Sequence, residues 1–310
     1  MTNTELLLDF KPITAEHLVA YNARLFALAA RGCEFTFANL LFWGEECICP
    51  FADGFLVFAC FGKRQMYLYP IVSEEDERAA IDTILDDARA RGIRTCITGF
   101  GGEEKARIEA MYPGFFRFFS MDASYDYVYD LNDLADLAGK KYDGKRNHVR
   151  RFERTHPDAL FEPIGKDNLA AVRAMAETWF RERLEKDPEA DLHGEERAIA
   201  LALDHFDELA LEGLLLREGD EILAFTIASR MSDDTFDVHF EKARADVAGA
   251  YAAINNRFAR YLREKYPAVR YLDREEDMGI EGLRRAKESY HPHHRIEKFW
   301  MIPVEQCDEK

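Results

Sequence analysis

The sequence contains little cysteine and no paired arrangement of it. Six cysteines are spread over 310 residues, without a C-x-x-C pair and without the spacing of a zinc site. Disulfides persist in oxidising compartments, so such scattered cysteines are typical of reduced, mostly buried thiols in a cytoplasmic protein. His291, His293 and His294 also match no standard zinc spacing. Cysteine and histidine usage therefore argues against a secreted disulfide scaffold and predicts no bound metal.

Long apolar runs are also missing. Residues 1–11 show no basic segment followed by an apolar core, so no signal peptide is expected. No run approaches the roughly 18 apolar residues that a membrane-spanning helix needs. Only 10 prolines and a hydrophobic content of 47% favour well-packed cores over disorder. At roughly 150 residues per domain, the length predicts two domains.

Positive charge is scarce except in one segment. The formal net charge is −17, which excludes uniform coating of nucleic acid or of an anionic membrane. Residues 140–154 nevertheless hold seven Lys or Arg against two acids, a local charge of +5. Removing this segment from the total of −17 leaves −22 for the rest of the chain. Tyr142, Val149 and Phe152 can share one helical face there, with the charges on the other sides.

The C-terminal third has a clear order of elements. Two apolar runs, 214–218 and 221–229, flank the turn residues Gly219 and Asp220, which is typical of a hairpin. In the next run, 235–242, polar and apolar residues alternate, which predicts a strand with one polar face. That face carries Asp237, His239 and Glu241, opposite Phe236, Val238 and Phe240.

A glycine follows this third strand. Gly249 opens a segment with apolar residues at helical spacing, and 269–272, 280–290 and 295–303 read as a strand, a short helix and a last strand. This order predicts a sheet that opens beside the N-terminus of the helix. The same order can be traced upstream, where Ser73 and Gly92 mark the start and end of one helix. We therefore expect an α/β chain with mixed sheets and two tandem domains, 1–135 and 136–310, with a basic linker at 139–154.

Several motifs resemble one known family, the C-terminal catalytic domain of phosphatidylglycerol lysyltransferases and its stand-alone soluble relatives. The resemblance rests on GKKYDGKRNH at 139–148, FDVHFEKA at 236–243, GAYAAINNRFA at 249–259 and REEDMGIEGLRRAKESYHP at 274–292. FTFANL at 35–40 and Trp43 fit the stand-alone group. The resemblance implies two tandem GNAT-like acyltransferase domains, related in layout to the Fem-type aminoacyl transferases.

The family resemblance also implies a reaction. Characterised members move an aminoacyl group from a charged tRNA to a lipid or cell-wall amine or hydroxyl, with no further cofactor. This sequence lacks the membrane-spanning region of the lipid-modifying enzymes, and it lacks the full glycine-rich turn by which coenzyme A users hold pyrophosphate. Two alternatives remain open: a coenzyme A-dependent N-acyltransferase, and a non-catalytic protein of the same fold that binds a small molecule or RNA. The expected acceptor is a small molecule, lipid or peptide, with no integral membrane contact.

Direct acyl transfer needs no covalent enzyme nucleophile, and the sequence has no G-x-S-x-G elbow. It needs a group that takes the acceptor's proton and one that protonates the leaving group. Glu241 and His239 on the polar strand face are candidate bases, although the face could equally be a solvated one. Tyr290, four residues after Ala286, has the Ala-x-x-x-Tyr spacing of the last GNAT helix, where the tyrosine often serves as the acid.

Three consecutive acids, Glu275, Glu276 and Asp277, follow a predicted strand end. Neighbouring carboxylates raise one another's proton affinity, so Glu276 is a candidate for acid–base work and Glu275 for capture of an α-amino group. The alternative is simple acidity before a helix that begins near Ile280.

Donor binding is expected at two segments. In the basic linker, Lys141, Lys145 and Arg146 are candidate phosphate ligands, with Asn147 as a polar reader of tRNA or coenzyme A. The helix that Gly249 opens contributes three further candidates, namely Gly249, Tyr251 and Asn255.

Overall fold

The computed structural model describes residues 8–28, 32–43, 47–61, 64–189 and 191–307. The chain divides into two compact units. Unit 1 comprises residues 1–125 and 296–310, and unit 2 comprises residues 126–295. Among the described residues, no helix has both the length and the apolar character that crossing a bilayer requires.

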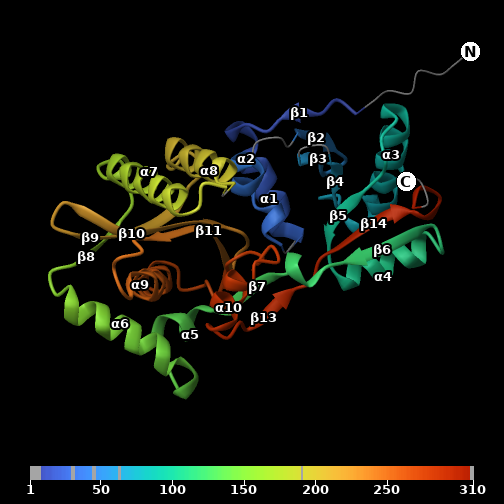
Figure 1. The fold of residues 1–310 in the computed structure, drawn as a ribbon. Helices are drawn as coiled ribbons and strands as arrows, with labels where there is room; N and C mark the ends of the chain where they lie inside the picture. Colours follow the sequence, from blue (N-terminus) through green and yellow to red (C-terminus); the bar gives the residue numbers. More distant parts are fainter. Residues whose placement is uncertain (1–7, 29–31, 44–46, 62–63, 190, 308–310) are drawn as a thin grey trace, which may run out of the picture. The chain divides into compact units, whose positions relative to one another are not determined.

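Unit 1 is built on a seven-stranded mixed sheet (Figure 1). The strands, in spatial order, are β1 (Lys11–Pro12), β2 (Cys47–Phe51), β3 (Gly54–Phe61), β4 (Arg64–Leu68), β5 (Ile97–Phe100), β14 (Phe299–Pro303) and β6 (Phe116–Ser120). Its α-helices are α1 (Leu18–Leu28), α2 (Phe37–Phe42), α3 (Glu74–Arg91) and α4 (Gly102–Met111). α3 begins after Ser73 and ends at Gly92, whose φ of +67° is readily adopted by glycine.

Unit 2 has a second seven-stranded mixed sheet. Its strands, in spatial order, are β13 (His294–Ile296), β7 (Asp126–Asp130), β12 (Tyr271–Asp273), β11 (Thr235–Ala243), β10 (Glu221–Arg230), β9 (Glu212–Glu218) and β8 (Leu160–Pro163). Its α-helices are α5 (Leu131–Asp136), α6 (Asp143–Thr155), α7 (Leu169–Lys186), α8 (His193–Asp204), α9 (Ala250–Lys265) and α10 (Glu281–Glu288).

The helices of unit 2 cover both faces of its sheet (Figure 1). α7 and α8 lie on one face, and α9 lies on the other with α5 and α6 packed outside it. The main core lies under α9, where Ile254 and Phe258 pack with Phe236 and Val238 of β11. Burial of large apolar side chains at roughly 25 cal/mol per Å² is the main force that fixes α9 to the sheet.

The division of the chain differs from the boundary expected at residue 135. β7 precedes that boundary and α5 spans it, and both belong to unit 2, because β7 pairs with β12. The single strand expected at 295–303 is two strands: β13 lies in the sheet of unit 2, and β14 lies between β5 and β6 in unit 1. Strand patterning shows that a segment is extended, but the choice of pairing partner depends on tertiary packing.

The sheet of unit 2 opens as the element order predicts. β11 and β12 are parallel and pair only from Thr235↔Tyr271 to Asp237↔Asp273. β12 ends there, while β11 continues to Ala243 and leads to Gly249 at the start of α9. The second half of β11 thus borders an opening at the N-terminal end of α9.

Candidate functional site

A β-bulge at His239 places Glu241 in this opening. Ala228 of β10 pairs with Val238 and Ile227 pairs with Phe240, so β11 carries one residue more than its partner between these pairs. A bulge reverses the faces of the residues beyond it. Strict alternation had put Glu241 on the same face as Asp237. In the structure, Glu241 points to α9 instead.

Glu241 is the centre of a polar group between β11, α9 and the residue after β12. Its Oε1 accepts a hydrogen bond from Nη2 of Arg274 at 3.0 Å, and its Oε2 accepts one from Nδ2 of Asn255 at 3.1 Å. The side chains of Glu241 and Arg274 are only 10% and 15% exposed. Burial disfavours the charged form of Arg274. The neighbouring groups outweigh this effect and raise the pKa of the Arg274 guanidinium, and Glu241 makes the largest contribution among them.

Tyr290 lies against the same guanidinium. The Cζ atom of Arg274 is 5.0 Å from the Tyr290 ring centroid. Burial raises the pKa of the Tyr290 hydroxyl; the charge of Arg274 opposes this shift and that of Glu241 adds to it. Among the described residues, no protein group forms a hydrogen bond with this hydroxyl, whereas the backbone carbonyl of Tyr290 accepts one from Tyr142 at 3.0 Å. The hydroxyl is therefore protonated at neutral pH and can donate to a ligand.

Lys145 covers the Tyr290 ring. Its Nζ is 3.6 Å from the ring centroid and donates a hydrogen bond to Oγ of Ser289 at 2.7 Å. Burial, and then the positive charge of Arg274, lower the pKa of Lys145 to about 8. Part of the Lys145 population is thus a neutral amine near physiological pH, which is uncommon for a lysine.

Three buried polar atoms around this group have no hydrogen-bond partner among the described residues: Nη1 of Arg274, Oδ1 of Asn255 and Oγ1 of Thr226. Thr226 lies directly opposite Glu241 in the β10–β11 ladder. A buried polar atom left unpaired costs about 1–3 kcal/mol, so native proteins usually satisfy such atoms with water or a ligand. One donor, one acceptor and one hydroxyl are therefore available to a polar ligand. We call Glu241, Asn255, Arg274, Tyr290, Lys145 and Thr226 the polar centre.

A buried lysine holds the loop that carries Arg274. Nζ of Lys287 donates hydrogen bonds to the carbonyl oxygens of Arg274, Glu275 and Glu276, at 2.9 Å for Glu275 and 2.6 Å for Glu276. Glu275 has a φ of +57°, a left-handed conformation that a residue with a side chain rarely adopts. Three carbonyl oxygens on one ammonium explain how this conformation is maintained.

His239, the other candidate base, belongs to a different group. Its Nε2 lies 2.8 Å from Oγ of Ser229, and its Nδ1 lies 3.5 Å from Asp237 and 3.4 Å from Glu275. Its side chain is only 1% exposed. In a regular strand, His239 and Glu241 would share a face, because they are two positions apart. The bulge puts their side chains on different faces. Glu275, the expected amine ligand, also lies in this second group.

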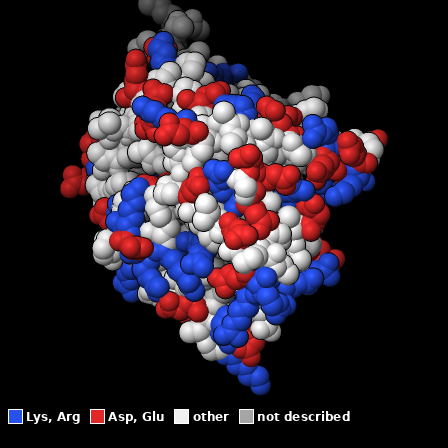
Figure 2. Space-filling model, turned by 90° about the vertical axis from the view of Figure 1, so that its left-hand side faces the viewer, with Lys and Arg blue, Asp and Glu red and all other residues white. Residues whose placement is uncertain are grey.

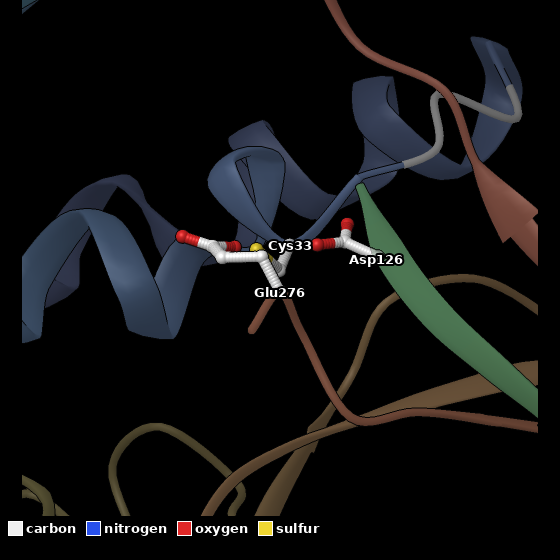
Figure 3. Close-up of side chains that lie close together, drawn as sticks. All are labelled: Cys33, Asp126 and Glu276. Carbon is white, nitrogen blue, oxygen red and sulfur yellow. The ribbon is translucent and has the colours of Figure 1, made fainter. Parts of the chain in front are cut away.

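Glu276 lies beside Asp126 at the start of β7 (Figure 3). Carboxylate oxygens of the two residues are within 4.8 Å of each other. Asp277, the third acid of the run, is buried and accepts hydrogen bonds from Tyr127 at 2.7 Å and Arg284 at 2.9 Å. Desolvation opposes the charge of Asp277, yet these hydrogen bonds lower its pKa to about 2. The three consecutive acids therefore have three different surroundings.

The four linker candidates also separate. Lys145 points into the polar centre, whereas Lys141 pairs with Asp133 at 2.9 Å. Arg146 donates hydrogen bonds to the carbonyl oxygens of Leu137 and Gly139, which fixes the start of α6. Asn147 is exposed on the outer side of α6.

Gly249 and Tyr251 begin α9. Gly249 has a φ of +92°, and a Cβ atom there would lie 2.6 Å from the carbonyl oxygen of His148 in α6. Glycine is therefore needed for the close packing of α6 on α9, independently of any role in donor binding. Tyr251 is 42% exposed in the first turn of α9.

Sequence reasoning did not select Arg274, Thr226 or Lys287 as functional residues. Arg274 lies within a motif that carries the family resemblance, which is the only signal that could have identified it. Lys287 lies within the same motif, whereas Thr226 shows no signal, because an inward threonine on a strand is an ordinary sequence feature. Their importance depends on neighbours distant in the sequence.

The fold belongs to the class of tandem GNAT-like proteins: each unit has a mixed sheet with helices, and solved structures of similar layout share it. The family model described as "Phosphatidylglycerol lysyltransferase, C-terminal" matches residues 26–302. The chain therefore belongs to this family, and the resemblance seen in the sequence is confirmed.

Three solved structures illustrate the relationship. A conserved protein of unknown function from Bacteroides thetaiotaomicron VPI-5482 is 34% identical, with a TM-score of 0.90 over 96% of this chain and 100% of that one. L-PGS from Bacillus licheniformis is 18% identical, with a TM-score of 0.68 over 94% of this chain and 92% of that one. FemX is 12% identical, with a TM-score of 0.61 over 96% and 98% of the two chains. The last two show the fold alone, and the comparison with curated proteins gave no match.

Proposed function

We propose that unit 2 transfers an aminoacyl group from a charged tRNA to an amine or hydroxyl acceptor, at the polar centre. The observation that carries this proposal is the set of unpaired buried atoms on Arg274, Asn255 and Thr226, beside a free tyrosine hydroxyl. An aminoacyl ester offers matching groups: a carbonyl oxygen that accepts hydrogen bonds and an α-ammonium that donates them. Family membership supports the same reaction class.

Each atom of the polar centre then has a role. Nη1 of Arg274 donates a hydrogen bond to the ester carbonyl oxygen and stabilises the negative charge that develops there, a contribution typically worth 10²–10³ in rate. Oδ1 of Asn255 and Oγ1 of Thr226 accept hydrogen bonds from the α-ammonium. Glu241 uses both oxygens to hold Arg274 and Asn255 in place.

In this proposal Lys145 is the general base and Tyr290 is the general acid. The acceptor nitrogen or oxygen forms a bond to the carbonyl carbon and gives its proton to the neutral Lys145 amine. The bond from that carbon to the ribose oxygen breaks, and this oxygen takes the proton of the Tyr290 hydroxyl. Exchange with solvent returns Lys145 and Tyr290 to their starting states. Glu241, the base favoured by the sequence, acts here by positioning, because Arg274 and Asn255 occupy its two oxygens.

Donor identity is tested directly. Purified full-length protein is incubated with labelled aminoacyl-tRNAs or with labelled acetyl-coenzyme A in a cell extract, and labelled products are identified by mass spectrometry. We expect label to leave the aminoacyl-tRNA and to appear on an amine or hydroxyl. Label transferred only from acetyl-coenzyme A would establish the N-acyltransferase alternative, and no transfer from either donor would favour a binding protein.

The pH dependence of transfer tests Lys145. Because its pKa is lowered to about 8, the neutral form increases as the pH rises through that value. The rate should therefore rise between about pH 7 and pH 9 and then level off. Lys145→Arg, which stays protonated, should be much slower and lose this rise. An unchanged profile in Lys145→Arg would assign the titration to another group.

A further inference from the structure

Only one cation of the basic segment, residues 140–154, belongs to the polar centre. Of its seven cations, Lys145 points inward, and Lys141 and Arg146 bind Asp133 and the backbone at the start of α6. The remaining four, Lys140, Arg150, Arg151 and Arg154, are exposed. Within the described part of the chain, none of these four side chains has an ion-pair or hydrogen-bond partner.

The three arginines of this set share one face of α6 with Asn147. Positions 150, 151 and 154 follow position 147 by three, four and seven residues, and this spacing places all four on one side of a helix. Val149 and Phe152, on the opposite side, are buried. The acids of the helix do not neutralise this face, because Glu153 pairs with Arg257 at 2.9 Å and Asp143 pairs with Arg146. We call Asn147, Arg150, Arg151 and Arg154 the outer face of α6.

Lys and Arg side chains gather on the lower part of the surface seen in Figure 2, over the region of unit 2 where α6 lies in Figure 1. Their concentration contrasts with the −22 that the rest of the chain carries. A polyanion would therefore be attracted to this face and repelled by most of the remaining surface.

We propose that the outer face of α6 binds the phosphate backbone of tRNA, with the arginines as phosphate ligands and Asn147 as a polar contact. This rests on the proposed function, which requires the 3′ end of the tRNA at the polar centre. Lys145 and Arg154 belong to the same helix, so they are separated along its axis by about 13 Å at 1.5 Å per residue. A tRNA bound along α6 can therefore present its 3′ end to Lys145.

RNA fits this face better than a membrane does. Helices that lie in a bilayer interface insert an exposed apolar face, whereas the apolar residues of α6 pack inside the unit. Arginine forks also match phosphate oxygens in two-point contacts.

The test uses the triple variant Arg150→Ala, Arg151→Ala, Arg154→Ala in the full-length protein. Binding of uncharged tRNA is measured by fluorescence anisotropy between 50 and 200 mM salt. We expect affinity at low salt to fall at least about tenfold, and the salt dependence to become shallower because fewer counterions are released. Lys145 and the polar centre remain intact, and the thermal midpoint checks folding.

The matched control is Arg181→Ala, Arg183→Ala, Lys186→Ala on α7. These three exposed cations change the net charge equally but lie on the helix that covers the other face of the sheet. The control should keep wild-type affinity and salt slope. Equal loss of affinity in both variants would show that net charge alone causes the loss, and this result would overturn the proposal. Unchanged binding in the α6 variant would also overturn it.

Two further results separate this surface from the reaction. If the wild type binds anionic phosphatidylglycerol vesicles through α6 and does not bind tRNA, the surface is a membrane contact and the proposal is wrong. If tRNA binding depends on α6 but no aminoacyl transfer occurs, the proposed tRNA-binding surface is supported and the proposed function is wrong. If transfer occurs and the α6 variant binds tRNA normally, the proposed function is supported and the proposed tRNA-binding surface is wrong.

Discussion

Replacing Tyr290 by phenylalanine is expected to lower the transfer rate by about 10²–10⁴-fold, as loss of a positioned acid typically does. The hydroxyl forms no hydrogen bond with a described protein group, so its removal leaves no buried partner unsatisfied. The thermal midpoint should therefore stay within a few degrees of the wild-type value. Single-turnover rates with charged tRNA, together with a thermal melt, measure both quantities.

The neighbouring Tyr129 provides the control. Its hydroxyl donates a hydrogen bond to the carbonyl oxygen of Lys287 at 2.9 Å, and its ring makes an edge contact with Tyr290. Tyr129→Phe should lower the free energy of unfolding by about 1 kcal/mol, the typical value of one such hydrogen bond. Its transfer rate should change far less than that of Tyr290→Phe. Equal rates in the two variants would show that Tyr290 has no role as the acid.

Replacing Glu241 by glutamine is expected to reduce both stability and transfer. The change leaves the Arg274 guanidinium mostly buried without its counter-charge. Breaking a buried ion pair in this way costs about 3–5 kcal/mol, and the partial exposure of Arg274 places the expected loss near the lower end of that range. Transfer should fall by about 10²–10³, because Arg274 loses the partner that aims it at the carbonyl oxygen.

The double variant Glu241→Gln, Arg274→Gln separates these two effects. It removes both charges, so most of the lost stability should return, while transfer should remain as low as in the single variant because no guanidinium is present. Chemical denaturation and single-turnover rates provide the two measurements. Recovery of transfer in the double variant would contradict the role assigned to Arg274.

Much of the fold of unit 2 could be predicted from local patterns. The hairpin turn at Gly219 and Asp220, the start of α9 at Gly249 and the apolar side of α6 all follow from residues near one another in the chain. Tight turns, helix starts and helical spacing depend on short-range geometry, which is why the sequence is enough for them.

The grouping of the candidate residues was predicted only in part. Glu241, Tyr290, Lys145 and Asn255 were selected from the sequence and lie together in the polar centre, whereas His239 and Glu275 form a separate group. A single inserted residue in the β10–β11 ladder causes the separation, and no local pattern marks it. The acid role of Tyr290 and the base role of Lys145 remain predictions for the experiments above.

The sequence by itself determined the family, the order of elements and the presence of a basic helix in an acidic chain. Only the tertiary structure decided that β14 pairs in unit 1, that Arg274 meets Glu241, and that one lysine of the basic segment points inward while three arginines face outward. The physical reason is the range of the interactions. Helical and strand periods arise from contacts within a few residues, whereas strand partners, a bulge and a buried ion pair depend on side chains that meet only after the sheet has formed.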